Sequence, residues 1–182
     1  MQKTEIRLAG FGGQGIVLLG NIIGKAASIY SRHYAALTQN YGPESRGGSC
    51  RAELIISDQP IEYPYIVNPE ILVVLSQGAY HEFGSKAPAG TLLLVDSELV
   101  KIPTPPAARV LSIPASRMAQ EMGRPVVANI IMLGFLARNS DVVSADALKK
   151  AVKDFIPAGS EEFNMKAFES GYKYSIPEGK PD

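Results

Sequence analysis

The sequence is short of the side chains that hold metals. It has one cysteine, Cys50, and two histidines, His33 and His81. A single cysteine forms no disulfide within the chain and cannot supply the set of thiolates that holds an iron–sulfur cluster. The two histidines lie too far apart in the sequence to have the spacing of zinc ligands. We therefore expect this chain by itself to build no metal site and no cluster site.

The sequence also lacks an excess of charge and a long hydrophobic run. Its 18 basic residues balance 18 acidic ones, which argues against a nucleic-acid or anionic-lipid partner. The longest apolar run, 126–137, is interrupted by Asn129 and is too short for the ~30 Å hydrocarbon layer of a membrane. Residues 1–5 do not have the pattern of a signal peptide. We expect a cytoplasmic protein without a membrane partner.

Apolar patterns along the chain alternate between strands and helices. They predict a single domain over residues 1–176, followed by a loose C-terminal tail, 177–182. The predicted strands are 6–9, 34–38, 49–57, 71–75, 91–95 and 109–113, and the predicted helices are 16–30, 78–84, 114–122, 126–137, 145–155 and 161–171.

Too few residues separate the second and third strands for a crossover helix, so we expect antiparallel pairing there. The predicted fold class is α/β, a three-layer Rossmann-like sandwich with a mixed sheet. Ser144 and Ser160 are expected to cap the last two helices. Gly20 and Gly24 lie four residues apart in the first helix, which indicates close packing of that helix on the sheet.

A glycine-rich turn, 10–15, lies where the first strand passes into the first helix. Gly10, Gly12 and Gly15 permit a tight turn and let a phosphate approach backbone N–H groups at the positive end of the helix. Gly13 adds conformational freedom, and Gln14 adds an amide that suggests a specific polar contact. The alternative is that the glycines only form a tight corner.

A second loop, 39–49, is shaped by proline and glycine. Pro43 fixes one φ angle, while Gly47 and Gly48 permit positive φ. Arg46 offers a planar fork for a carboxylate or phosphate, and successive glycine N–H groups favour an anion. The alternative is an ion pair between Glu44 and Arg46 that only stiffens the turn. Both loops follow strands of one sheet, so we expect them to be neighbours.

Other polar residues are expected to be structural or of secondary interest. Cys50 starts a strand with no histidine near it in sequence, so packing is the simpler interpretation. Asn129 lies on an apolar helix, where a buried amide needs a hydrogen-bond partner. Ser76 and Gln77 follow a buried strand at its carboxyl end, where open α/β sheets bind ligands, and are therefore second-tier candidates.

The turn 10–15 (Gly-Phe-Gly-Gly-Gln-Gly) and the loop 41–48 (Tyr-Gly-Pro-Glu-Ser-Arg-Gly-Gly) resemble those of the gamma subunit of 2-oxoacid:ferredoxin oxidoreductases. Pro60-Ile61, after the next strand, is also similar to that family. The resemblance is most specific between residues 6 and 75. The loop 41–48 is the more specific of the two motifs.

The resemblance implies a multisubunit enzyme that converts a 2-oxoacid to an acyl-coenzyme A and carbon dioxide while reducing ferredoxin. Alpha and beta subunits would bind thiamine diphosphate, a ferredoxin-like delta subunit would carry iron–sulfur clusters, and this chain would help form the coenzyme A side of the active site. It would hold no catalytic group and be inactive alone. Its candidate binding residues are Gly10, Gly12, Gly13, Gln14, Gly15, Glu44, Arg46, Gly47 and Gly48. Among substrates 2-oxoglutarate is favoured because the chain is short and separate. Pyruvate, branched-chain oxoacids and indolepyruvate stay open.

Two other functions remain open. One is a stand-alone nucleotide-binding protein or dehydrogenase. The absence of an acidic residue after the second strand, where it would hold a ribose hydroxyl, argues against this function. The other is a purely structural assembly subunit whose glycine turn touches only protein.

Overall fold

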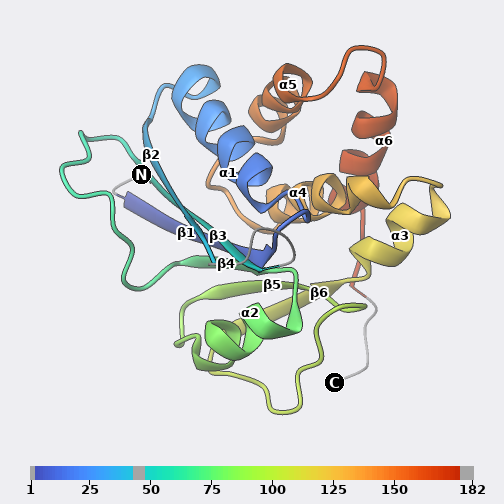
Figure 1. Ribbon diagram of the computed structural model, residues 1–182. Helices are drawn as coiled ribbons and strands as arrows, with labels where there is room; N and C mark the ends of the chain where they lie inside the picture. The colour runs from blue at the N-terminus through green and yellow to red at the C-terminus, as the bar shows by residue number, and fades with distance from the viewer. Residues whose placement is uncertain (1–2, 43–47, 177–182) are drawn as a thin grey trace.

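A six-stranded mixed sheet forms the centre of the molecule (Figure 1). The computed structural model describes residues 3–42 and 48–176. The strand order is β2-β3-β1-β4-β5-β6. β1, β4, β5 and β6 pair in parallel, whereas β3 pairs antiparallel with both β1 and β2. The strands are β1 (Lys3–Phe11), β2 (Tyr34–Tyr41), β3 (Ser49–Ser57), β4 (Ile71–Val74), β5 (Leu92–Asp96) and β6 (Arg109–Ile113).

Helices cover both faces of this sheet, which confirms the predicted three-layer α/β sandwich. α1, α3, α4, α5 and α6 pack over one face and α2 over the other (Figure 1). The helices are α1 (Ile16–Lys25), α2 (Gln77–Glu82), α3 (Ala115–Glu121), α4 (Ala128–Asn139), α5 (Ala145–Phe155) and α6 (Glu161–Tyr172), with short turns η1 (Ala26–Tyr30), η2 (Gly84–Lys86) and η3 (Pro125–Val127). The predicted tail, 177–182, lies outside the described residues.

β4 shows why the sheet is stable in its centre. All four of its residues are apolar and buried. Ile71 and Val73 pack into the core under α1 and α4, while Leu72 and Val74 pack into the core under α2. A strand buried on both faces cannot alternate with polar residues, and the continuous apolar run in the sequence has this cause.

Two local predictions need correction. Ser144 caps α5 by accepting from the Ala147 N–H at 3.2 Å, as expected, but Ser160 does not cap α6. Its backbone at ψ 3° is not extended as a cap requires, and its hydroxyl instead donates to the Pro157 carbonyl at 2.6 Å. The predicted helix 16–30 is α-helical only to Lys25 and continues as the π-helical turn η1.

Glycines let elements approach closely at two places. A β-carbon on Gly20 would lie 3.1 Å from the β-carbon of Ala52, which confirms the predicted packing of α1 on the sheet. Where α4 crosses α6, a β-carbon on Gly134 would overlap the Phe168 carbonyl, and one on Gly171 would overlap the Ile131 carbonyl. The α4–α6 contact is therefore a contact of backbone on backbone.

This contact predicts opposite effects for two glycine-to-alanine changes. Gly134→Ala should lower the free energy of unfolding by about 1–3 kcal/mol, because the neighbouring backbone must move. Gly24→Ala is the matched control, since its nearest neighbour is the side-chain atom Leu54 Cδ1 at 3.3 Å. Alanine in a helix interior gains up to about 1 kcal/mol over glycine, so this variant should unfold at or above the wild-type denaturant midpoint. Equal midpoints for both variants in urea unfolding would contradict the close crossing.

Candidate functional site

After β1 and after β4 the chain turns to opposite faces of the sheet. β1 leads into α1 on one face, and β4 leads into α2 on the other (Figure 1). The two strand ends are adjacent, with the Leu75 N–H donating to the Ala9 carbonyl at 2.9 Å. In open α/β sheets a crevice forms at such a switch point, outside the carboxyl ends of the strands. The glycine turn 10–15 lies at this point.

Two glycines in the turn have a backbone conformation that other residues adopt at a cost. Gly13 has φ 99° and Gly15 has φ 75°, both in the left-handed region. Gly15 is also the N-cap of α1, and a β-carbon there would overlap the amide nitrogen of Asn129. Gly10 belongs to β1 rather than to the turn. Glycine is therefore required at position 15 for both its φ angle and its contact with α4.

The side chain of Gln14 is occupied within the chain. Its Oε1 accepts from the Phe11 N–H at 2.6 Å, and its Nε2 donates to the Leu75 carbonyl at 2.6 Å. The specific polar contact that the sequence suggested therefore joins the turn to the end of β4. Gln14 positions the turn through these bonds, and within the turn the N–H groups of Gly13 and Gly15 have no acceptor among the described residues.

The second loop lies beside the glycine turn, as predicted. The Gly12 N–H donates to the Gly48 carbonyl at 2.9 Å. Gly48 is the last residue of the motif, and near the start of the motif the Gly42 N–H donates to the Ser49 carbonyl at 2.8 Å. Glu44, Arg46 and Gly47 lie outside the described residues, so their expected roles remain predictions.

On the side of the turn that faces α4 lies a cavity of about 320 Å³, here called the α4-side cavity. Its lining includes Gly13, Gln14, Leu75, Asp96, Val126 and Asn129. Val126 is 77% exposed at its mouth. The carboxylate of Asp96 is buried and accepts three hydrogen bonds, from the backbone N–H and hydroxyl of Ser116 and from the Glu98 N–H. Apolar walls and an occupied acid leave hydrogen-bond donors as the free polar groups of this cavity.

Asn129 is a buried residue whose amide lines the α4-side cavity. It is only 6% exposed, and its Oδ1 accepts from the Ile130 N–H at 2.8 Å, which leaves Nδ2 as a donor. Among the described residues Nδ2 has no acceptor, and neither do the N–H groups of Gly13 and Gly15. These donors adjoin the amino end of α1, where the helix dipole is positive. The arrangement suits an anionic group.

The structural role predicted for Asn129 is confirmed by its bond to a backbone group. The amide does bind a backbone group, as expected of a buried polar residue, but only through its oxygen. The signal that pointed further was its place in the first turn of an otherwise apolar helix, 128–139. A polar side chain there faces the preceding loop, and only the fold shows that this region adjoins Gly15.

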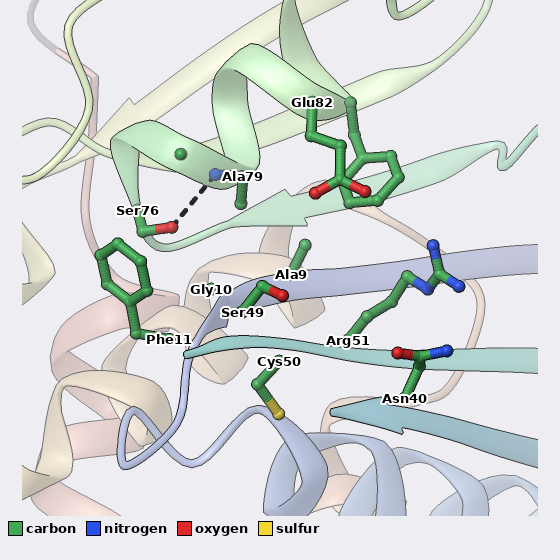
Figure 2. A pocket seen from close by; sticks show the side chains of 12 residues that line it. Ala9, Gly10, Phe11, Asn40, Ser49, Cys50, Arg51, Ser76, Ala79 and Glu82 are labelled. Atoms are coloured by element: carbon green, nitrogen blue, oxygen red, sulfur yellow. Dashed lines mark hydrogen bonds between the residues drawn. The ribbon is translucent and has the colours of Figure 1, made fainter. Parts of the chain in front are cut away.

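A second pocket, of about 170 Å³, lies on the α2 side of the turn (Figure 2). It is here called the α2-side pocket, and its lining includes Phe11, Asn40, Ser49, Arg51, Ser76 and Glu82. The thiol of Cys50 points away from this space toward α1 (Figure 2). Burial raises the pKa of the Cys50 thiol, which keeps it protonated and unreactive. The packing role predicted for Cys50 is confirmed.

Ser76 and Gln77, the second-tier candidates, form hydrogen bonds with neighbouring backbone groups. Ser76 caps α2 by accepting from the Ala79 N–H at 3.2 Å. The Gln77 amide pairs with the backbone of Lys101, accepting its N–H at 2.7 Å and donating to its carbonyl at 3.1 Å. These bonds explain why polar residues follow β4. Gln77 therefore orders the loop after β5, and Ser76 lines the α2-side pocket.

Comparison with known proteins identifies the family. Residues 5–174 match the pyruvate ferredoxin/flavodoxin oxidoreductase family. This chain belongs to that family. It is 47% identical to the 2-oxoglutarate synthase subunit KorC of Methanocaldococcus jannaschii, over 94% of this chain and 93% of that protein. It is 34% identical to the pyruvate synthase subunit PorC of Methanothermobacter marburgensis, over 93% of this chain and 96% of that protein.

A solved structure supports the same assignment. The gamma subunit of a keto/oxoacid ferredoxin oxidoreductase from Geobacter sulfurreducens superposes with a TM-score of 0.83 and is 38% identical. The match covers 93% of this chain and 96% of that chain. Within residues 3–42 and 48–176, no helix is long and apolar enough to cross a membrane, and no group of histidine, cysteine and acidic side chains is arranged to hold a metal ion.

The two bonds of Gln14 predict a stability effect at the turn. Gln14→Glu keeps the size of the side chain but replaces the donor to the Leu75 carbonyl with an oxygen. We expect the free energy of unfolding to fall by about 1–3 kcal/mol, because an acceptor is left facing an acceptor. Gln120→Glu, on the exposed surface of α3, makes the same chemical change and should leave the urea midpoint unchanged. Equal midpoints for both variants would show that the turn does not depend on this bridge.

Proposed function

We propose that this chain is the gamma subunit of a 2-oxoglutarate:ferredoxin oxidoreductase and that its glycine turn helps form the coenzyme A side of the active site. The observation that carries this role is the Asn129 Nδ2 donor, which has no acceptor among the described residues and lies beside the left-handed turn at the switch point of the sheet. Coenzyme A carries phosphate groups, which are the anions that such donors bind. The enzyme oxidatively decarboxylates a 2-oxoacid to an acyl-coenzyme A and reduces ferredoxin.

The residues of this chain fit coenzyme A and do not fit the other cofactors. Cys50 is the sole cysteine and is buried with a raised pKa, so it cannot anchor an iron–sulfur cluster. Among the described residues no cluster of metal-ligating side chains exists for the metal ion of thiamine diphosphate. We assign thiamine diphosphate to alpha and beta subunits and the clusters to a ferredoxin-like delta subunit.

The contribution of the chain to the reaction is binding and orientation. Backbone N–H groups of the turn and the Asn129 amide donate to a phosphate, and the dipole of α1 favours its negative charge. The Gln14 bridge holds these donors in place before the ligand arrives, which lowers the entropic cost of binding. No side chain of the α4-side cavity, as far as the structure describes it, is a free general acid or base, because the Asp96 oxygens are occupied.

The choice of 2-oxoglutarate is supported by sequence identity. The chain is more similar to a 2-oxoglutarate synthase subunit, at 47%, than to a pyruvate synthase subunit, at 34%. Both relatives are matched over nearly their whole length, so the difference does not come from a missing part. Pyruvate is therefore the substrate to test against 2-oxoglutarate.

Exposed aromatic side chains support a partner surface at the same edge. Phe11 is 43% exposed and Tyr41 is 63% exposed, and these residues end β1 and β2 where the two loops begin. Aromatic residues are enriched in protein interfaces because they bury large apolar area at low entropic cost. We propose that this edge meets the thiamine-binding subunits, which places the coenzyme A groups between the chains.

The dehydrogenase alternative conflicts with the fold. A dinucleotide-binding domain places an acidic residue at the end of the parallel strand next to β1, where it holds a ribose hydroxyl. Here β2 ends in Gln39, Asn40 and Tyr41, and β3 separates it from β1. The assembly-only alternative makes a different prediction about coenzyme A, which the following experiment decides.

Asn129→Asp in the reconstituted enzyme tests the binding role. The new side chain can still accept from the Ile130 N–H but presents a carboxylate oxygen in place of Nδ2. We expect the KM for coenzyme A to rise about tenfold or more, because an acceptor with charge replaces a donor. The KM for 2-oxoglutarate should be unchanged. Asn68→Asp, on the exposed surface, controls for net charge.

If Asn129→Asp assembles normally and leaves the KM for coenzyme A at the wild-type value, the turn has only a structural role. If the enzyme purified with its native partners turns over pyruvate faster than 2-oxoglutarate, the substrate assignment is wrong. Mass spectrometry of the copurifying chains identifies the partners directly.

The purified chain without partners should be colourless and inactive with any 2-oxoacid. The reason is the lack of cluster ligands and of a free acid or base in the described cavity. An absorbance spectrum and a dye-reduction assay with 2-oxoglutarate and coenzyme A check this. Oxoacid-dependent dye reduction by the isolated chain would contradict the division of labour between subunits.

A further inference from the structure

Arg51 projects from β3 toward the α2 side of the sheet, beside the α2-side pocket (Figure 2). Its guanidinium lies over the Phe83 ring, with Cζ 5.5 Å from the ring centroid. Arg7 lies over the same ring at 4.8 Å. Stacking on an aromatic face orients a guanidinium and leaves its edge of N–H donors free.

Arg51 has no carboxylate at hydrogen-bonding distance among the described residues. Arg7 and Arg51 share one carboxylate, that of Glu53, which is 8% exposed. Glu53 Oε1 lies 2.6 Å from Arg7 Nε but 3.7 Å from Arg51 Nε, so it is hydrogen-bonded to Arg7 only. Arg7 also donates to the Ile66 carbonyl at 3.4 Å. Arg7 is thus the arginine that this acid neutralises.

The N–H donors of the Arg51 guanidinium lack hydrogen-bond acceptors among the described residues. Its Nε is buried and has no hydrogen-bond partner, and its terminal nitrogens have no acceptor among the described residues. A guanidinium presents its donors in one plane and meets a phosphate or carboxylate through two parallel bonds. Leaving a partly buried charged donor unpaired is costly, so an anion that completes it is stabilised.

Neutral donors surround the same space. Asn40 is the register partner of Arg51 on β2, and Ser49 lies two residues before Arg51 on the same face of β3. The Ser76 hydroxyl enters from the loop after β4 (Figure 2). Because Ser76 Oγ already accepts from the Ala79 N–H, its proton is available for a ligand. Donors on several sides of a small pocket suit a tetrahedral group better than a planar one.

We propose that the α2-side pocket is a phosphate-binding site in which Arg51 is the charged ligand-binding residue. Its volume of about 170 Å³ admits a single phosphate group with some water. The phosphate comes either from inorganic phosphate or from coenzyme A. Only the second source rests on the proposed function. Glu82 lines the opposite wall, forms no ion pair with Arg51 among the described contacts, and opposes an anion.

The test is calorimetric titration of the full chain with inorganic phosphate, coenzyme A and dephospho-coenzyme A at constant ionic strength. Arg51→Gln should weaken phosphate binding about tenfold or more, because a charged two-pronged donor is lost. Arg51→Lys should recover little of this loss. Glu82→Gln should tighten binding. Arg109→Gln, at the exposed start of β6 on the far edge of the sheet, removes the same charge and should change nothing.

The two sources are distinguished by which ligand responds to Arg51→Gln. If the variant binds coenzyme A more weakly but dephospho-coenzyme A equally well, the pocket binds the 3′-phosphate. If it binds both more weakly, the pocket binds the diphosphate. If only the binding of inorganic phosphate is weakened, the site is independent of coenzyme A. Each of these results supports a phosphate site at Arg51.

Two results would overturn the proposal. One is the absence of phosphate binding by the wild-type chain at millimolar concentration. The other is equal weakening by Arg51→Gln and Arg109→Gln, which would mean that affinity follows net charge. If Arg51→Gln does not fold, Glu82→Gln still tests the proposal, because this variant should raise the affinity for phosphate. An unchanged affinity in Glu82→Gln would exclude an anion in the pocket. Loss of phosphate binding in Arg51→Gln with an unchanged coenzyme A KM in Asn129→Asp would retain this site and reject the proposed role of the glycine turn in binding coenzyme A.

Discussion

Two hydrogen bonds from one side chain hold the candidate site together. The Gln14 side chain accepts a hydrogen bond from the Phe11 N–H and donates one to the Leu75 carbonyl, so it joins the end of β1 to the end of β4. The chain leaves these two strands toward opposite faces of the sheet, and this bridge is the side-chain link between the turn and the end of β4. Gln14 also lines the α4-side cavity, so the position of the turn beside that cavity depends on it.

The polar groups around the turn share one electrostatic character. The buried acids are occupied, Asp96 by Ser116 and Glu53 by Arg7, while the donors Asn129 Nδ2 and the Arg51 guanidinium lack acceptors among the described residues. Free donors next to occupied buried acids favour the binding of anions, and Glu82 is the acid that opposes it in the α2-side pocket. This agrees with the proposed role of a subunit that positions an anionic co-substrate.

The elements were predictable where a local pattern suffices. The four apolar residues of β4 could only be a strand buried on both faces, and the short connection between β2 and β3 required antiparallel pairing. Ser144 and Ser160 show the limit of this approach. Both precede helices and carry the same hydroxyl, but only the backbone of Ser144 is extended, and a backbone angle depends on where the preceding loop must go.

The sequence by itself determined the fold class, the family and the need for glycine in the turn, because these follow from short-range periodicity and from the conformational freedom of single residues. It could not determine the partners of the polar side chains. Gln14 meets Leu75 across 61 residues and Arg7 meets Glu53 across 46, and Asn129 reaches Gly15 from a helix much later in the chain. Whether a given donor finds an acceptor depends on such contacts between distant segments. Only tertiary packing, which brings these segments together, determines which donors are bonded and which are free.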